Sequence, residues 1–216
     1  MTITARREQR MREILDRRLG SVVVVLETVY RRHNVSAILR SAEGFGLHEV
    51  HLVTNGFQPS RGATRGAERW LDVQVQSDTE TTVRGLQARG FQVWAADLHP
   101  DAVSATSVPV EGPIAILVGA ELTGVSDAAR AVVDGFVTIP MQGMTESLNV
   151  SVATACILSH ITTRRRAKVG VGDLEVARRD QVLADWIARE DVAMKGRVVR
   201  SELQLDIASE KAVDSR

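Results

Sequence analysis

The sequence predicts an α/β fold in which a mostly parallel sheet is covered by helices on both faces. Short aliphatic runs alternate along the chain with segments of helical periodicity, which is the pattern of parallel strands joined by crossover helices. The run Val22–Leu26 contains four valines and a leucine and is typical of a strand buried on both faces. A chain of 216 residues, 44% of them hydrophobic, is also long enough to bury a core of its own.

The elements follow one another in a regular order. The aliphatic runs predict strands at 22–26, 50–53, 71–75, 91–96, 114–118 and 136–139. Helical periodicity and capping signals predict helices at 4–19, from Asn34 to Phe45, from a Ser77–Glu80 capping box to Gly90, and at 126–133, 148–166 and 174–195. The segment 55–69 is rich in Gly, Arg and Ser and predicts a loop. The first and last helices therefore flank the sheet on the N- and C-terminal sides.

The formal net charge of zero hides an uneven distribution. Residues 1–20 contain six basic and three acidic residues, and residues 164–200 contain ten basic and six acidic residues. The stretch 21–163 has nine basic and fourteen acidic residues. On charge alone, solvated faces of two surface helices are the favoured interpretation, and extensions that grip a nucleic acid are the alternative.

Several common sites are excluded by missing motifs. Gly44-Phe45-Gly46 lacks the third glycine of a dinucleotide fingerprint, and neither a P-loop nor a Gly-x-Ser-x-Gly elbow occurs. Cys156 is the single cysteine and the five histidines lack ligand spacing, so no metal site is expected. No aliphatic run reaches the ~20 residues of a membrane span, and the arginine-rich start has no signal-peptide core. A cytoplasmic location is therefore expected.

Three segments carry the strongest functional signal. Residues 33–46 (HNVSAILRSAEGFG) place the amide of Asn34 and the guanidinium of Arg40 on one helix, where such groups can hold a phosphate. Residues 116–126 (ILVGAELTGVS) end a buried strand in a glycine turn, and residues 139–155 (IPMQGMTESLNVSVATA) lead through a loop into a helix. In this order and at these separations, the segments closely resemble the three motifs of the TrmH family of SPOUT RNA methyltransferases, over about residues 20–170.

The resemblance implies an α/β SPOUT fold whose C-terminal part, about residues 114–165, is threaded as a trefoil knot. Hydrophobic periodicity cannot reveal such a knot, because knots are nearly absent from proteins. The implied organisation is a basic N-terminal helix at 1–20, a methyltransferase domain at 21–170, a helical extension at 171–200 and a loose tail at 201–216.

The resemblance also implies S-adenosylmethionine as the cofactor, held in a bent form by backbone groups at strand ends. This location agrees with the rule that ligands of parallel sheets lie beyond the carboxyl ends of the strands. Matched by position, the cofactor-binding residues are Ala96, Gly119, Glu121, Ile139, Met141, Ser147 and Leu148. Taken alone, Ile139 and Leu148 are equally typical of a hydrophobic core.

The implied reaction is methyl transfer to a ribose 2′-hydroxyl, with Arg40 as the base and with Asn34, Ser147 and Asn149 ordering the site. A guanidinium is normally a cation, so Arg40 acts as a base only where bound phosphate and desolvation lower its proton affinity. The milder alternative is that it clamps the phosphate beside the reactive ribose. Because histidine titrates near neutrality, His33 is the rival base, although a structural role is about as well supported.

The terminal helices match the extensions of TrmH-type transfer RNA enzymes, which implies transfer RNA as the substrate, its D-loop guanosine at position eighteen as the target, and a homodimer. RNA contacts are expected from six arginines near the two ends of the domain, namely Arg10, Arg17, Arg18, Arg164, Arg165 and Arg166. The alternatives are a ribosomal RNA ribose methyltransferase and a catalytically silent RNA-binding protein on the same scaffold. A small-molecule α/β enzyme would need a cofactor fingerprint that the sequence lacks.

Overall fold

The computed structural model describes residues 3–29, 31–54 and 66–192. The chain divides into two compact units, one formed by residues 16–174 and the other by residues 1–15 together with 175–216. The larger unit contains the sheet and all three motif segments. Residues 193–200 of the expected C-terminal extension and the expected tail at 201–216 lie outside the described residues.

In its described residues, the larger unit is built on a seven-stranded sheet with the order β3-β2-β1-β6-β4-β7-β5. Every pairing between neighbouring strands is parallel. The α/β prediction with a mostly parallel sheet is thus confirmed. The strands are β1 (Val22–Glu27), β2 (Glu49–Val53), β3 (Asp72–Gln76), β4 (Gln92–Ala96), β5 (Val103–Ser104), β6 (Ile114–Val118) and β7 (Gly135–Thr138).

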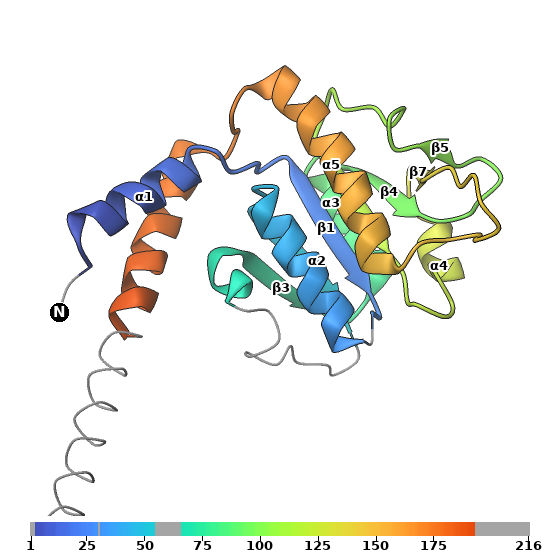
Figure 1. Ribbon diagram of the computed structural model, residues 1–216, viewed down its shortest axis with the longest axis horizontal. Coiled ribbons are helices and arrows are strands. Elements are labelled where there is room, and N and C mark those ends of the chain that lie inside the picture. The colour runs from blue at the N-terminus through green and yellow to red at the C-terminus, as the bar shows by residue number, and fades with distance from the viewer. Residues whose placement is uncertain (1–2, 30, 55–65, 193–216) are drawn as a thin grey trace, which may run out of the picture. The chain divides into compact units, whose positions relative to one another are not determined.

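Helices cover both faces of this sheet. Helices α2 (Arg32–Gly44) and α5 (Val150–Val169) pack against each other on the face that is toward the viewer in Figure 1. Helices α3 (Thr79–Ala88) and α4 (Asp127–Arg130) lie on the other face, and a short 3-10 helix, η1 (Ala67–Trp70), precedes β3. Strand β1 shows why both faces need a cover. Val22, Val24 and Leu26 join the core with α2 and α5, whereas Val23 and Val25 join the core with α3 and α4.

Several helix starts and ends differ from the sequence predictions. Helix α1 (Ala5–Leu15) ends four residues earlier than expected, because Leu19 forms a parallel bridge with Leu47. Asn34 does not cap α2 but lies in its first turn, after the N-cap Arg31. At α3 the cap is Asp78, whose carboxylate accepts from the Thr81 backbone N–H at 2.6 Å, and not the expected Ser77. The error at α3 arises because neighbouring polar residues compete locally for the same cap.

The smaller unit contains α1 and a helix over residues 176–192. Met11 and Leu15 are buried on α1, and Trp186 is 2% exposed on the second helix. Arg7 forms an ion pair with Glu190 at 3.2 Å, which links the two helices. Among the described residues, no helix combines the length and the apolar character needed to cross a bilayer.

Because all strands run in one direction, their carboxyl ends meet at one edge of the sheet. The segments that follow β4, β6 and β7 therefore leave the sheet on the same side as the start of α2, which follows β1. All three motif segments converge at this edge.

Candidate functional site

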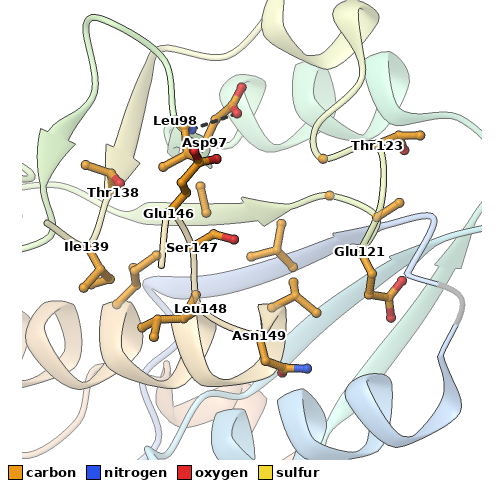
Figure 2. Close-up of a pocket in the computed structure, with 18 of the residues that line it drawn as sticks. Asp97, Leu98, Glu121, Thr123, Thr138, Ile139, Glu146, Ser147, Leu148 and Asn149 are labelled. Carbon is orange, nitrogen blue, oxygen red and sulfur yellow. Dashed lines mark hydrogen bonds between the residues drawn. The ribbon is translucent and has the colours of Figure 1, made fainter. Parts of the chain in front are cut away.

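A cleft of about 590 Å³ opens at the carboxyl edge of the sheet (Figure 2). Its wall is formed by the residues that follow β4, β6 and β7, by the start of α5 and by the start of α2. Apolar side chains such as Val118, Ile139 and Leu148 line it beside carboxylate, amide and hydroxyl groups. A volume of this size and a mixed lining are typical of a small-molecule site.

A chain of hydrogen bonds joins the three motif segments at this cleft. Asn34 is 1% exposed, and its Nδ2 donates to Oε1 of Glu121 at 2.8 Å. The Nδ2 of Asn149 donates to Oδ1 of Asn34 at 3.1 Å. The backbone N–H of Arg31 donates to the same Glu121 oxygen at 3.1 Å. Asn149 is itself held as the N-cap of α5, where its Oδ1 accepts from the Ser151 N–H at 2.9 Å.

The loop after β6 is closed tightly on itself. Ala120 and Gly124 exchange backbone hydrogen bonds of 3.0 and 2.9 Å, and Gly124 has a φ of +67°. A Cβ atom at Gly119 would lie 2.1 Å from the carbonyl oxygen of Gly124, so only glycine fits there. Glu27, at the end of β1, accepts from the N–H and hydroxyl of Ser126 at 2.9 and 2.6 Å and anchors the far side of the loop.

An ion pair forms the part of the wall next to β4. The Nε of Arg130 donates to Oδ2 of Asp97 at 2.6 Å, and its Nη1 donates to Oδ1 of Asp127 at 2.9 Å. The hydrogen bonds from Arg130 to Asp97 and then Asp127 raise the pKa of the guanidinium above its usual value. Asp97 also accepts from the Leu98 N–H at 2.9 Å, which is visible in Figure 2. Both charges of this pair are therefore matched locally.

The structure brings together nearly all of the residues that the sequence singles out. The cleft is lined by every expected cofactor residue and by three of the four expected catalytic residues, namely Asn34, Ala96, Gly119, Glu121, Ile139, Met141, Ser147, Leu148 and Asn149. In Figure 2, Ser147, Leu148 and Asn149 follow one another along the strip that leads into α5. Within the described residues, no group of His, Cys, Asp and Glu is arranged to hold a metal ion.

Arg40 is the exception, because it is exposed on α2 and does not line the cleft. A helix turns by about 100° per residue, so six residues carry Arg40 roughly 240° around the axis from the buried Asn34. Arg40 is therefore not part of the cleft lining within the described residues, and its catalytic role stays a prediction. His33 is also exposed and outside the cleft lining.

Two of the six arginines expected to contact RNA are interior residues instead. Arg18 is 1% exposed, and its guanidinium donates to the carbonyl of Leu47 at 2.6 Å and to Oε1 of Glu43 at 2.9 Å. Burial lowers the pKa of Arg18, and the Glu43 carboxylate partly offsets this effect. Arg165 is 7% exposed and donates to the Ser21 hydroxyl at 2.9 Å and to the Glu111 carbonyl at 2.7 Å. The RNA-contact prediction is wrong for these two side chains.

The other four arginines differ in how far they are engaged. Arg166 is partly buried, and its guanidinium donates to the carbonyls of Arg17, Phe45 and Val171. Arg164 is partly exposed and donates to the Ala105 carbonyl at 3.3 Å. The side chains of Arg10 and Arg17 are exposed.

The sequence reasoning missed several charged residues of the cleft, among them Asp97, Arg31 and Arg130. Asp97 directly follows the strand that ends at Ala96, so the strand-end rule could have found it. Arg31 precedes the first motif segment by two residues, and its place as N-cap of α2 was hidden by the expectation of a cap at Asn34. Arg130 lies on a four-residue helix, and no local signal brings it to the cleft.

Comparison with known proteins agrees with this geometry. Residues 21–159 match the SpoU rRNA Methylase family. A tRNA (guanosine(18)-2′-O)-methyltransferase from Thermus thermophilus is 41% identical over 191 residues, which are 86% of this chain and 98% of that protein. The crystal structure of the TrmH/SpoU tRNA modifying enzyme of A. aeolicus superposes with a TM-score of 0.78 at 30% identity, covering 86% of this chain and 96% of that one.

An AdoMet-bound rRNA methyltransferase from Sinorhizobium meliloti superposes with a TM-score of 0.63 at 25% identity, covering 70% of this chain and 60% of that one. The segment that matches the family model, residues 21–159, contains the strands, the cleft and the hydrogen-bonded chain from Glu121 to Asn149. The protein therefore belongs to the SpoU rRNA Methylase family.

Proposed function

We propose that this protein is an S-adenosylmethionine-dependent methyltransferase that modifies the ribose 2′-hydroxyl of guanosine 18 in transfer RNA. The observation that carries the proposal is the hydrogen-bonded chain Glu121–Asn34–Asn149, which holds all three motif segments at the mouth of one cleft. The name of the Thermus thermophilus relative, which is similar over 86% of this chain, supports transfer RNA and this nucleotide as the substrate.

The cleft fits the cofactor in size and in chemistry. Its volume of about 590 Å³ is ample for a nucleoside with an amino-acid side arm. Ile139 and Leu148 offer apolar surface to an adenine ring, and backbone groups at Ala96, Gly119 and Met141 offer hydrogen bonds. When bound, S-adenosylmethionine supplies an electrophilic methyl group on a positively charged sulfur. Carboxylates in the cleft wall suit that positive charge.

The residues of the hydrogen-bonded chain would position the ribose rather than react with it. Asn34 is held from both sides, so its amide cannot rotate, and Asn149 is held by the α5 cap. Ser147 is exposed in the cleft, where its hydroxyl can donate to the ribose. Such a preorganised site places the attacking oxygen without reorganisation and excludes water, which accelerates transfer.

We assign Arg40 a contact with RNA phosphate that orients the substrate over the cleft mouth. An exposed guanidinium is a cation, which suits a phosphate clamp better than a base. Arg40→Ala should lose most of the turnover, Arg40→Lys should be severely impaired because the planar fork is lost, and His33→Ala should retain substantial activity. The reverse result for the alanine variants of Arg40 and His33 would make the histidine the base.

We further propose a homodimer that packs through the exposed faces of α2 and α5. The groove between these helices is lined mainly by small residues, which allow close approach of a second copy: Ala37, Ser41, Ser151, Val152, Ala155, Cys156, Ser159 and His160. Cys156 is the single cysteine of the chain, so a short bis-maleimide should give a covalent dimer through this position. A monomer in sedimentation at micromolar concentration would contradict this assembly.

Three other parts of the proposal concern the contacts with RNA, the threading of the chain and its location in the cell. The exposed Arg10 and Arg17 would bind RNA phosphates outside the cleft, with Arg164 contributing from α5. The segment 114–165 would be threaded as a trefoil knot, since β6 lies between β1 and β4 while the chain returns from β7 to α5. A transfer RNA enzyme would work in the cytoplasm without a resident metal.

The decisive experiment is methyl incorporation from labelled S-adenosylmethionine into unmodified transfer RNA transcripts. We expect labelling at guanosine 18, and no labelling when a 2′-deoxyguanosine stands at that position. Ribosomal RNA fragments form the comparison arm. Labelling of ribosomal RNA alone would favour the ribosomal alternative, which the name of the Sinorhizobium meliloti neighbour also motivates. Cofactor binding without transfer to either RNA would indicate a silent RNA-binding protein.

A further inference from the structure

The charged residues of the cleft are not equally committed to partners. Among the described residues, two arginines line the cleft, Arg31 and Arg130. Arg130 is bound to Asp97 at 2.6 Å and to Asp127 at 2.9 Å, so its charge is matched. In the part of the chain that the structure describes, the guanidinium of Arg31 has neither a hydrogen-bond nor an ion-pair partner. Of these two arginines, Arg31 is thus the one whose guanidinium can still bind an anion.

The backbone of Arg31 is nevertheless rigidly held. Its N–H donates to Oε1 of Glu121 at 3.1 Å, and its carbonyl accepts from the N–H groups of Asn34 and Val35 at 2.9 and 3.2 Å. These bonds place the root of the side chain beside the oxygen that also receives the Asn34 amide. The long side chain is exposed and begins from a fixed point next to the expected ribose position.

We propose that Arg31 binds the phosphate that flanks the reactive ribose, as a positioning residue for the transfer. The inference rests on the proposed function, since it takes the substrate to be a polynucleotide whose ribose lies at the mouth of the cleft. A guanidinium is suited to this task because its planar fork matches two phosphate oxygens. A phosphate next to the modified nucleotide is the anion that must lie near the mouth whenever the ribose enters.

The assignment separates Arg31, the N-cap of α2, from Arg40, which is exposed farther along that helix. Arg31 lines the cleft and would bind the phosphate adjacent to the target, whereas Arg40 lies outside the lining and would bind the backbone farther along the RNA. The contact of Arg31 would also act on a group that is present before and after transfer. We therefore expect its loss to raise KM more than it lowers kcat.

The test combines protein variants with RNAs that carry a single neutral methylphosphonate linkage, placed in turn at each phosphate around the target nucleotide. Binding is measured with each RNA for the wild type, Arg31→Ala and Arg31→Lys. Removing one charge-assisted contact typically weakens binding about 10- to 100-fold. The wild type should show this loss at one linkage flanking the target. Arg31→Ala should bind native RNA with the same loss of affinity. A neutral linkage at that position should then cause no further loss.

The control variant is Arg84→Ala, which removes an exposed arginine on α3 that pairs only with Glu80 at 3.5 Å within the described residues. It should bind like the wild type and keep the full sensitivity to the neutral linkage. Arg31→Lys retains charge without the fork, so it should keep part of that sensitivity. Arg31→Ala should also reduce the slope of log affinity against log salt by about one phosphate contact. Cofactor binding and thermal stability of Arg31→Ala should match the wild type, which excludes a merely structural role.

If every neutral linkage weakens the binding of Arg31→Ala as much as it weakens the binding of the wild type, the assignment is overturned. The substitution and the neutral linkage would then remove different contacts. A loss of cofactor binding or of stability would overturn it as well. Failure of the proposed function has a different signature, since the wild type would then not methylate guanosine 18 at all. The binding cycle needs no turnover and still reports whether Arg31 contacts a phosphate.

Discussion

Replacing Asn34 by aspartate tests the hydrogen-bonded chain that joins the three motif segments. The wild-type Nδ2 donates to Oε1 of Glu121 at 2.8 Å, and Oδ1 accepts from Asn149 at 3.1 Å. Asn34→Asp preserves the size of the side chain and its acceptor toward Asn149. It places a carboxylate oxygen against Glu121 at a position that is 1% exposed in the wild type.

The expected cost follows from the bond that is lost and the repulsion that replaces it. A hydrogen bond to a charged group contributes roughly 1.5–3 kcal/mol, and two carboxylates in contact add repulsion that only a shared proton relieves. We expect the free energy of unfolding of Asn34→Asp to be about 3 kcal/mol lower at pH 8. For a chain of this size that corresponds to a Tm lower by roughly 6–12 °C.

The same reasoning gives the sign of the pH dependence. In the variant, the facing carboxylates raise the pKa of the pair in the folded state above the unfolded values. The folded protein then binds more protons than the unfolded one, so the stability of the variant falls as the pH rises through the raised pKa. The difference from the wild type should be smallest near pH 5 and largest at pH 8.

Urea unfolding of three proteins across this pH range is the assay: the wild type, Asn34→Asp, and Asn34→Asp combined with Glu121→Gln. The double variant restores a donor opposite the new acceptor, because a glutamine amide can donate to the aspartate. It should recover at least half of the lost stability at pH 8. The reasoning is refuted if Asn34→Asp equals the wild type at pH 8, or if the double variant is no more stable than Asn34→Asp.

Three further predictions address two charged residues of the larger unit and one glycine of the cleft. Arg18→Met should lower the free energy of unfolding by about 3 kcal/mol in urea titration, because a buried charge network is broken, and should leave the salt dependence of RNA binding unchanged. Gly119→Ala should abolish S-adenosylmethionine binding in calorimetric titration, since its Cβ would lie 2.1 Å from a backbone oxygen; Gly143→Ala, with its nearest atom at 4.0 Å, should bind like the wild type. Burial alone would raise the pKa of Glu49, but hydrogen bonding, first from Arg89, lowers it from 4.5 to about 2. The stabilisation from the ionised Glu49 is therefore full above the unfolded pKa and is lost as the pH falls toward 2. Glu49→Gln should be less stable than the wild type by up to about 3 kcal/mol at pH 7. Acid titration should show the stabilities of the variant and the wild type converging near pH 2.

Local patterns in the sequence were sufficient to predict the class of fold and most of its elements. A run such as Val22–Leu26 has apolar side chains on both faces of a strand, and the structure buries all five. The ends of helices were predicted less well, as at Ser77 and Asp78, because adjacent polar residues can each satisfy the same orphan N–H groups. The two-residue strand β5 and the 3-10 helix η1 were missed because elements this short have no periodicity to detect.

Nine residues of the family motifs line the cleft, because motif spacing preserves which side chains follow each strand, and their roles stay predictions. Tertiary structure alone decided which arginines are exposed and can contact RNA. Arg18 and Arg165 have the same kind of sequence neighbours as Arg17 and Arg164. The first two are nevertheless buried, where their guanidinium groups donate to carbonyls that are distant in the sequence. Arg31 reaches the cleft because a loop 90 residues away accepts its backbone N–H. A residue's own sequence neighbourhood carries no record of such partners, since long-range hydrogen bonds depend on strand order and packing.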